Sequence, residues 1–250
     1  SNLYYNTTCG KAAEALRRVS GMDRIFFTNS GAEANEGALK AARKYAWQKK
    51  SGRFEFIAMK DSFHGRTMLT VTATGQDEYK LPFKPLPPGF KHVDFGDINA
   101  IKSAIDENTA AVLIEIVQGE GGINVAPDGY FEELDAYCKE NNVLLIIDEV
   151  QTGVFRTGEF LASNLYDIEP DIITLAKGIG GGVPMGAVMT KHKDIWAAGD
   201  HGSTFGGNYL VTAAALEVLD ILENLKDSGT LDETIIYFTK KLNDIFEKVC

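Results

Sequence analysis

A run of five apolar residues that ends in a carboxylate constrains this 250-residue chain more than any other stretch. Residues 143–147 are all Val, Leu or Ile, and the run is too short for a buried helix, so it predicts a strand buried on both faces. Asp148 then lies at the carboxyl end of that strand, where open α/β sheets place their ligand sites. An ordinary helix cap or ion pair is the alternative role for this aspartate.

Similar apolar stretches alternate with helical patterns along the chain. We expect strands at 25–27, 54–59, 92–95, 110–116, 143–147, 171–175 and 186–190. We expect helices over 11–19, 32–49, 97–105, 127–141, 208–225 and 232–248. Residues 68–74 fit a strand or a helix, and the proline-rich segment 80–90 predicts an extended surface loop. This alternation predicts an α/β fold with a mainly parallel central sheet and helices on both faces.

Composition narrows the class of protein. The formal charge of −10, from 25 basic and 35 acidic residues without a prominent basic cluster, argues against nucleic acid or membrane as partners. Cys9, Cys138 and Cys250 are odd in number and far apart, which predicts a reducing compartment, the cytoplasm, with Cys138 buried on a helix. The histidines lack ligand spacing, so we expect no metal. Both ends of the chain suggest the central part of a longer protein.

A stretch with several small residues, at 30–35, joins a predicted strand to a predicted helix. Ser30-Gly31-Ala32 lets a ligand approach the backbone, and the start of the helix offers free N–H groups and the positive end of its dipole. These features favour a phosphate site, and the absence of a following Gly-Lys-Ser/Thr excludes a Walker loop. A plain tight turn is the alternative.

A lysine followed by glycines forms the second unusual stretch. Lys177 follows a predicted buried strand, so we expect its amine to be partly desolvated, with a lowered pKa that makes it a nucleophile for carbonyl carbon. The glycines at 178–182 do not have dinucleotide spacing, because the third glycine would fall on Val183 or Met185. A surface lysine beside a flexible loop is the alternative.

Asp148 and Lys177 end successive predicted strands, so both can face one cleft. A lysine amine, a buried carboxylate and a phosphate-binding helix start are the parts that a pyridoxal phosphate site needs. The amine forms a Schiff base, the carboxylate keeps the pyridine nitrogen protonated, and the helix start binds the phosphate.

Six motifs occur in the order of a known family, at residues 30–35, 63–67, 118–122, 148–153, 176–177 and 202–208. The chain resembles the class III pyridoxal-phosphate aminotransferases of the ornithine type, which implies fold type I of the pyridoxal-phosphate transferases. The resemblance also implies a large cofactor domain over 1–225 and the start of a smaller C-terminal domain over 226–250.

The resemblance implies roles around the cofactor ring. Lys177 is similar to the Schiff-base lysine, which also moves the proton, and Asp148 to the partner of the pyridinium nitrogen. Gln151 resembles the residue that binds the phenolic oxygen. Val150 and Phe63 resemble the two residues that hold the faces of the ring.

Other roles implied by the resemblance lie at the edges of the ring. His64 is expected to be structural or a neighbour of the ring. Gly31 and Ala32 resemble the amides that bind the phosphate, although Ala32 lacks the hydroxyl group found in many relatives. Ser203 and Thr204 resemble a phosphate ligand donated across the interface of a homodimer with shared active sites.

Two residues resemble substrate ligands of the family. Arg66 is similar to the arginine that binds the substrate carboxylate, since a guanidinium can bind a carboxylate with two hydrogen bonds. Glu120 resembles a glutamate that pairs with an arginine from the C-terminal part, which this chain does not contain. Glu149 is expected to point away from the cofactor, toward a basic group such as Arg156.

The reaction implied by the resemblance is transamination. The sequence is most similar to enzymes that transfer the δ-amino group of N2-acetylornithine to 2-oxoglutarate. Ornithine, succinylornithine and 4-aminobutyrate are alternative donors within the family. A nucleotide-binding α/β module without covalent chemistry is the alternative from another class, and it leaves Lys177 unexplained.

Overall fold

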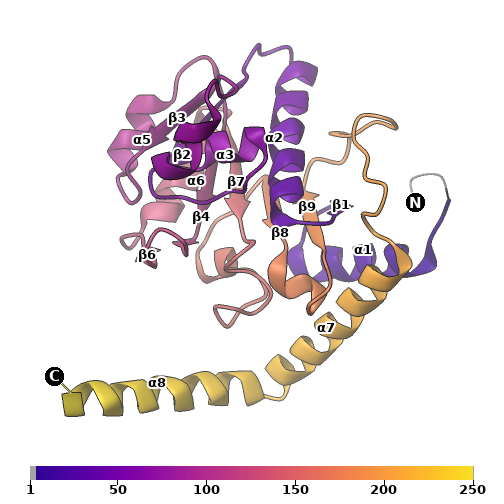
Figure 1. The fold of residues 1–250 in the computed structure, drawn as a ribbon, viewed down its shortest axis with the longest axis vertical. Helices are drawn as coiled ribbons and strands as arrows, with labels where there is room; N and C mark the ends of the chain where they lie inside the picture. Colours follow the sequence, from indigo (N-terminus) through magenta and orange to yellow (C-terminus); the bar gives the residue numbers. More distant parts are fainter. Residues whose placement is uncertain (1–3, 250) are drawn as a thin grey trace.

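A seven-stranded sheet lies at the centre of the fold, with helices on both of its faces (Figure 1). The structure is a computed structural model that describes residues 4–249, so Cys250 lies outside the described residues. The strands of this sheet are β1 (Arg24–Thr28), β2 (Glu55–Met59), β3 (Phe90–Val93), β4 (Thr109–Glu115), β7 (Leu144–Asp148), β8 (Ile172–Leu175) and β9 (Gly186–Thr190). A separate hairpin pairs β5 (Val117–Gln118) with β6 (Asn124–Val125).

The helices follow the strands along the chain. The α-helices are α1 (Thr7–Ser20), α2 (Gly31–Gln48), α3 (Met68–Ala73), α4 (Asp77–Lys80), α5 (Ile98–Ala104), α6 (Tyr130–Glu140), α7 (Tyr209–Asp227) and α8 (Thr230–Val249). Three short 3-10 helices complete the fold: η1 (Leu81–Phe83), η2 (Ala162–Leu165) and η3 (Lys177–Gly180).

The sheet is mainly parallel. Its strand order is β1-β9-β8-β7-β4-β2-β3, and β9 alone in this sheet runs antiparallel to its neighbours. The strands β8, β7, β4, β2 and β3 form parallel pairs in that order. The predicted fold class is therefore confirmed, and the carboxyl ends of β7 and β8 open at the same edge of the sheet.

The strand β7 is buried along its whole length, as its branched apolar residues predict. Leu144 and Ile146 pack on one face, against the alanine-rich helix α2. Leu145 and Ile147 pack on the other face, with Phe131 of α6. Burying each of these side chains stabilises the fold by about 1.5–3 kcal/mol. The carboxylate at the end of β7 is thus attached to one of the most firmly packed strands.

Three local expectations need correction or a decision. Residues 68–73 form a helix, because Thr67 caps it and exchanges hydrogen bonds with Thr70. The segment 80–90 is not extended throughout, since η1 (Leu81–Phe83) occupies its start. The strand expected at 92–95 is β3 (Phe90–Val93), two residues earlier.

The expected burial of Cys138 on a helix is confirmed, since this residue of α6 has its side chain in the core.

The C-terminal helix extends away from the sheet. Figure 1 shows α8 leaving the end of α7 and running clear of the α/β body. Its apolar side chains are exposed: Ile235, Ile236, Tyr237, Phe238, Leu242, Ile245 and Phe246. A domain boundary near residue 225 stays a prediction. Within residues 4–249, no helix combines the length and apolar character needed to cross a membrane.

Candidate active site

A cavity of about 560 Å³ opens at the carboxyl edge of the sheet. It is lined by the ends of β4 and β7, the residues that follow β8, the start of α2 and the loop that follows β2. The cavity brings together all the predicted site residues except Ser203 and Thr204: Gly31, Ala32, Phe63, His64, Arg66, Glu120, Asp148, Val150, Gln151 and Lys177. The prediction that Asp148 and Lys177 face one cleft is therefore confirmed.

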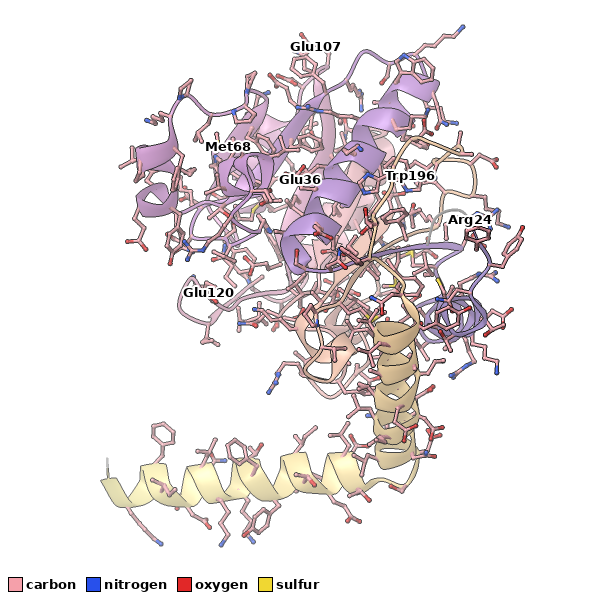
Figure 2. The ribbon with its side chains drawn as sticks, turned by 45° about the vertical axis from the view of Figure 1, so that its right-hand side comes forward. Arg24, Glu36, Met68, Glu107, Glu120 and Trp196 are labelled. Carbon is pink, nitrogen blue, oxygen red and sulfur yellow. The ribbon has the colours of Figure 1, made fainter. Side chains whose placement is uncertain are left out.

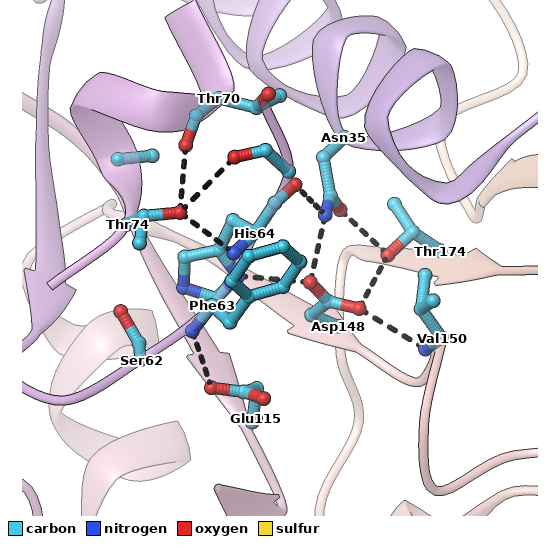
Figure 3. A network of polar contacts seen from close by, with 12 residues as sticks. Asn35, Ser62, Phe63, His64, Thr70, Thr74, Glu115, Asp148, Val150 and Thr174 are labelled. Atoms are coloured by element: carbon cyan, nitrogen blue, oxygen red, sulfur yellow. Dashed lines mark hydrogen bonds and ion pairs between the residues drawn. The ribbon is translucent and has the colours of Figure 1, made fainter. Parts of the chain in front are cut away.

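Asp148 is a buried carboxylate that is held by several donors (Figure 3). Its Oδ2 accepts hydrogen bonds from His64 Nδ1 at 2.8 Å and from Asn35 Nδ2 at 2.7 Å. Its Oδ1 accepts from the Val150 amide at 3.0 Å. A buried carboxylate without such donors would be costly, so these bonds offset the cost of burying Asp148 beside the cavity.

Two of the residues around Asp148 were not singled out from the sequence. Asn35 lies one turn after Gly31 on α2, and its helical spacing places both on one face. Thr174 precedes the end of β8 and donates its hydroxyl to Asn35 Oδ1 at 2.8 Å. The spacing of Asn35 from Gly31 is a signal that could have identified it, whereas the pairing with Thr174 depends on how the helix packs on the sheet.

Lys177 begins η3, one residue after the strand β8 ends, and has a positive φ of 46°. Its Nζ donates to Gln151 Oε1 at 2.5 Å, so the amine and the amide of two predicted site residues meet in the cavity. Its side chain is exposed in this structure. The expected partial desolvation of this lysine is therefore wrong for the described chain.

The start of α2 forms one wall of the cavity. Ser30 caps the helix by accepting the Glu33 amide at 3.2 Å, while the amides of Gly31 and Ala32 have no acceptor within the helix. A Cβ on Gly31 would lie 2.9 Å from Val150 Cγ1, so only glycine lets the helix start approach the end of β7 this closely. The free amides and the helix dipole together favour an anion here.

The loop after β2 supplies an aromatic ring and a guanidinium. The Phe63 amide donates to Glu115 Oε2 at 3.1 Å, which ties this loop to the end of β4. The Arg66 guanidinium lies 4.4 Å from the centre of the Tyr79 ring and 5.5 Å from that of Phe63. Within residues 4–249, no carboxylate forms an ion pair with Arg66, so its charged head can take an anion from outside.

Glu115 is a second buried carboxylate beside the cavity, and sequence reasoning did not single it out. Its burial raises its pKa to about 7, an effect that the nearby His64 opposes and the charge of Asp148 increases. Glu115 ends a buried strand, as Asp148 does, and that shared position is the signal that could have identified it.

Glu120 lies on the loop between β5 and β6 (Figure 2). Two contacts hold this hairpin against the loop after β2. Gln118 Nε2 donates to the Lys60 carbonyl at 2.7 Å, and a Cβ on Gly121 would lie only 2.4 Å from the Asp61 carbonyl oxygen. The exposed Glu120 side chain is thus carried on a closely packed turn at the mouth of the cavity.

Ser203 and Thr204 lie apart from the main cavity. They line a separate hollow with Phe26 and His201, and Ser203 Oγ accepts from Asn29 Nδ2 at 3.1 Å. The structure of this one chain therefore does not bring them to Lys177.

The prediction of a basic partner such as Arg156 for Glu149 is wrong. The Glu149 carboxylate instead accepts from the Thr152 hydroxyl and from the Ala162 and Ser163 amides. Burial raises the pKa of Glu149, and these three donors oppose that rise. This carboxylate anchors the turn after β7 and takes no part in the cavity.

Comparison with known proteins agrees with this arrangement. A family described as Aminotransferase class-III matches residues 1–249. The chain is 49% identical over 247 residues to the acetylornithine aminotransferase of Methanothermobacter thermautotrophicus, covering 98% of this chain and 62% of that protein. It is 51% identical over 245 residues to that of Wolinella succinogenes, covering 97% and 62%. The chain thus spans about 62% of the length of these curated relatives.

A solved structure shows the same fold. The ornithine aminotransferase of Toxoplasma gondii, with partial occupancy of PLP at its active site, superposes with a TM-score of 0.86 at 39% identity. The match covers 92% of this chain and 55% of that one.

Proposed function

The chain belongs to the class-III aminotransferase family, and from this premise we propose that it carries the cofactor site of an acetylornithine aminotransferase. In this proposal the whole protein transfers the δ-amino group of N2-acetylornithine to 2-oxoglutarate, giving N-acetylglutamate semialdehyde and glutamate in arginine biosynthesis. The observation that carries the proposal is the meeting of Asp148, Lys177 and the start of α2 around one cavity.

The residues present fit pyridoxal phosphate. A buried carboxylate, a primary amine and a helix start with free amides are the groups that its ring nitrogen, its aldehyde and its phosphate require. Glycine at position 31 keeps the backbone accessible, because a Cβ there would meet Val150. When bound, pyridoxal phosphate supplies an electron sink for the pair released from the substrate carbon.

We assign each contact to a residue of this cavity. Lys177 would hold the cofactor covalently, and Asp148 would pair with its ring nitrogen. Gln151 would donate to the phenolic oxygen. Val150 and Phe63 would cover the two faces of the ring, an arrangement that suits the offset and edge contacts of aromatic groups.

The remaining contacts lie around the phosphate and the edge of the ring. Gly31 and Ala32 would bind the phosphate through their amides. His64 would act through Asp148, to which its Nδ1 lies 2.8 Å away. Ser203 and Thr204 would serve the active site of a second copy of the chain, which accounts for their place outside the cavity of their own chain.

The chain's own side chains then perform the proton transfers. Once the donor amine has replaced it on the cofactor, the Lys177 amine would take the proton from the δ-carbon of the donor and pass it to the cofactor. Asp148 would stabilise the positive charge on the ring nitrogen, and that positive charge would stabilise the negative charge that develops at the substrate carbon in the transition state. Arg66 binds the carboxylate of each substrate, and Glu120 lies at the mouth where a further charged group would be recognised.

The proposal also covers the oligomeric state and the cellular compartment. We propose a homodimer with shared active sites in the cytoplasm, without nucleic acid or membrane as partners. Ornithine, succinylornithine and 4-aminobutyrate are the alternative donors. Enzymes for these donors share the residues that bind the cofactor and differ in the residues that bind the distal group of the donor. A nucleotide-binding module is less well supported, because it leaves the Lys177–Gln151 contact without a purpose.

The experiment is the visible spectrum of the full-length protein before and after addition of each amine. An absorbance band that is bleached at the lowest concentration by N-acetylornithine supports cofactor, lysine and substrate together. A band bleached best by ornithine or 4-aminobutyrate keeps the chemistry and changes the donor. Absence of any band after pyridoxal phosphate is supplied would overturn the proposal.

A further inference from the structure

Asn35 is a buried amide whose polar atoms are all engaged (Figure 3). Its Nδ2 donates to Asp148 Oδ2 at 2.7 Å and to the His64 carbonyl at 2.8 Å. Its Oδ1 accepts from the Thr174 hydroxyl at 2.8 Å. The strand β7, the loop after β2 and the strand β8 therefore each provide one hydrogen-bond partner for this amide of α2.

These partners allow only one orientation of the amide. If its oxygen and nitrogen were exchanged, the oxygen would face two acceptors, Asp148 Oδ2 and the His64 carbonyl. The Thr174 hydroxyl carries a single proton, and its 2.8 Å contact to Asn35 is shorter than its 3.4 Å separation from Asp148 Oδ1. The amide nitrogen thus points at Asp148 as a fixed donor.

The consequence for Asp148 is a difference between its two oxygens. Asn35 and His64 donate to Oδ2 and occupy both of its lone pairs. Oδ1 receives one short bond, from the Val150 amide at 3.0 Å, and keeps acceptor capacity. Because Asp148 lines the cavity, this remaining acceptor capacity is available to a group that binds there.

We propose that Asn35 is a positioning residue that, together with His64, saturates Oδ2 of Asp148 and presents Oδ1 to the protonated ring nitrogen of the cofactor. This inference rests on the proposed function, since it presupposes pyridoxal phosphate in the cavity. Without the donor at Asn35, Oδ2 is left with one partner in a buried setting. The carboxylate then binds the ring nitrogen less tightly and in more than one orientation.

The test uses Asn35→Leu in the full-length protein, since leucine keeps a similar volume and removes the donor. The readouts are the Kd for pyridoxal phosphate after removal of the cofactor, and the pH at which the visible spectrum of the bound cofactor changes. We expect Kd to rise by about 10- to 100-fold, the equivalent of one lost hydrogen bond to a charged group. The matched control is Gln48→Ala on the same helix, which loses its amide bond to the Asp194 carbonyl and should leave both readouts unchanged.

A double variant separates positioning from a general structural role. In the Asp148→Asn background, Asn35→Leu should change Kd by no more than about twofold, because the charge on which it acts is absent. An equal loss in both backgrounds would mean that Asn35 only holds the His64 loop, and would overturn the inference. So would wild-type readouts in Asn35→Leu.

Two further measurements cover other outcomes. If Asn35→Leu fails to fold, Thr174→Val frees Asn35 Oδ1 without touching its nitrogen, and it should raise Kd in the same direction by a smaller factor. An unchanged Kd in that variant would count against the inference. A wild-type protein that shows no cofactor absorbance at all would instead overturn the proposed function, so the two failures are distinguishable.

Discussion

Glu115 and Asp148 are register partners on the adjacent parallel strands β4 and β7. Both carboxylates are buried, and both end their strands at the edge of the sheet that carries the cavity. They differ in their donors, because Asp148 accepts from two side chains and an amide whereas Glu115 accepts from backbone amides. One edge of the sheet therefore holds a carboxylate with three short hydrogen bonds and a second carboxyl group, that of Glu115, whose pKa is raised to about 7.

The first prediction concerns the pH dependence of stability at Glu115. Its pKa of about 7 lies above the 4.5 of an unperturbed glutamate, mainly because of burial. The folded state therefore binds this proton more tightly, and the resulting stability is full below pH 4.5 and is lost as the pH rises through 7. The variant Glu115→Gln mimics the protonated form at every pH and should not lose this contribution.

The measurement is the free energy of urea unfolding of both proteins at pH 5.5 and pH 8.5. Between these two values, the stability of Glu115→Gln relative to wild type should rise by about 2 kcal/mol. Comparing the two proteins cancels the titration of other groups. A difference between the proteins that is the same at both pH values would contradict the raised pKa.

The second prediction concerns the charge of Asp148. Asp148→Asn keeps the size of the side chain but removes the charge that we propose to face the ring nitrogen, so turnover should fall by about 100- to 1000-fold. The circular dichroism spectrum should remain that of wild type, because β7 keeps its apolar packing. An Asp148→Asn protein with normal turnover would rule out the assigned role. Lys177→Ala provides the reference, since it should abolish turnover altogether.

The position of Asp148 could be predicted from the sequence because it depends on local features. Five branched apolar residues define the strand, and the parallel neighbour that ends before Lys177 follows from the same pattern. The grouping of Asp148 with Lys177 needs only the rule that parallel strands end at one edge. Burial on both faces follows from the run of apolar residues and is observed.

Other features depend on packing that no local pattern encodes. The pairing of Asn35 with Thr174 requires α2 to pack on the sheet in the one position along its axis that brings Asn35 next to Thr174 of β8. The exposure of Lys177 depends on how open the cavity is, which the residues beside it in the chain do not determine. Residues 68–73 are helical although their β-branched residues favour a strand, because the Thr67–Thr70 cap supplies the first turn with hydrogen bonds.

The third prediction concerns Arg66 as the ligand of the substrate carboxylate. Its guanidinium is held over Tyr79 and has no carboxylate partner among residues 4–249. Arg66→Ala should therefore raise KM for both substrates by about 10- to 100-fold, the equivalent of a lost charge-assisted pair. Arg66→Lys keeps the charge but not the two-pronged geometry, so its KM should fall between the two. A wild-type KM in Arg66→Ala would show that the carboxylate binds elsewhere.

The fourth prediction concerns the turn that carries Glu120. In Gly121→Ala the new Cβ would lie 2.4 Å from the Asp61 carbonyl oxygen, a backbone atom that can move only with its loop. The free energy of urea unfolding should fall by about 1–3 kcal/mol, and the displaced Glu120 should change KM for the amino donor. The matched control is Gly10→Ala in α1, where the new Cβ meets no atom within 4 Å. That change should instead stabilise the fold by about 0.5–1 kcal/mol, since alanine favours helix. Equal stability of Gly121→Ala and wild type would mean that the hairpin can move away from Asp61 freely, and that this contact does not set the place of Glu120.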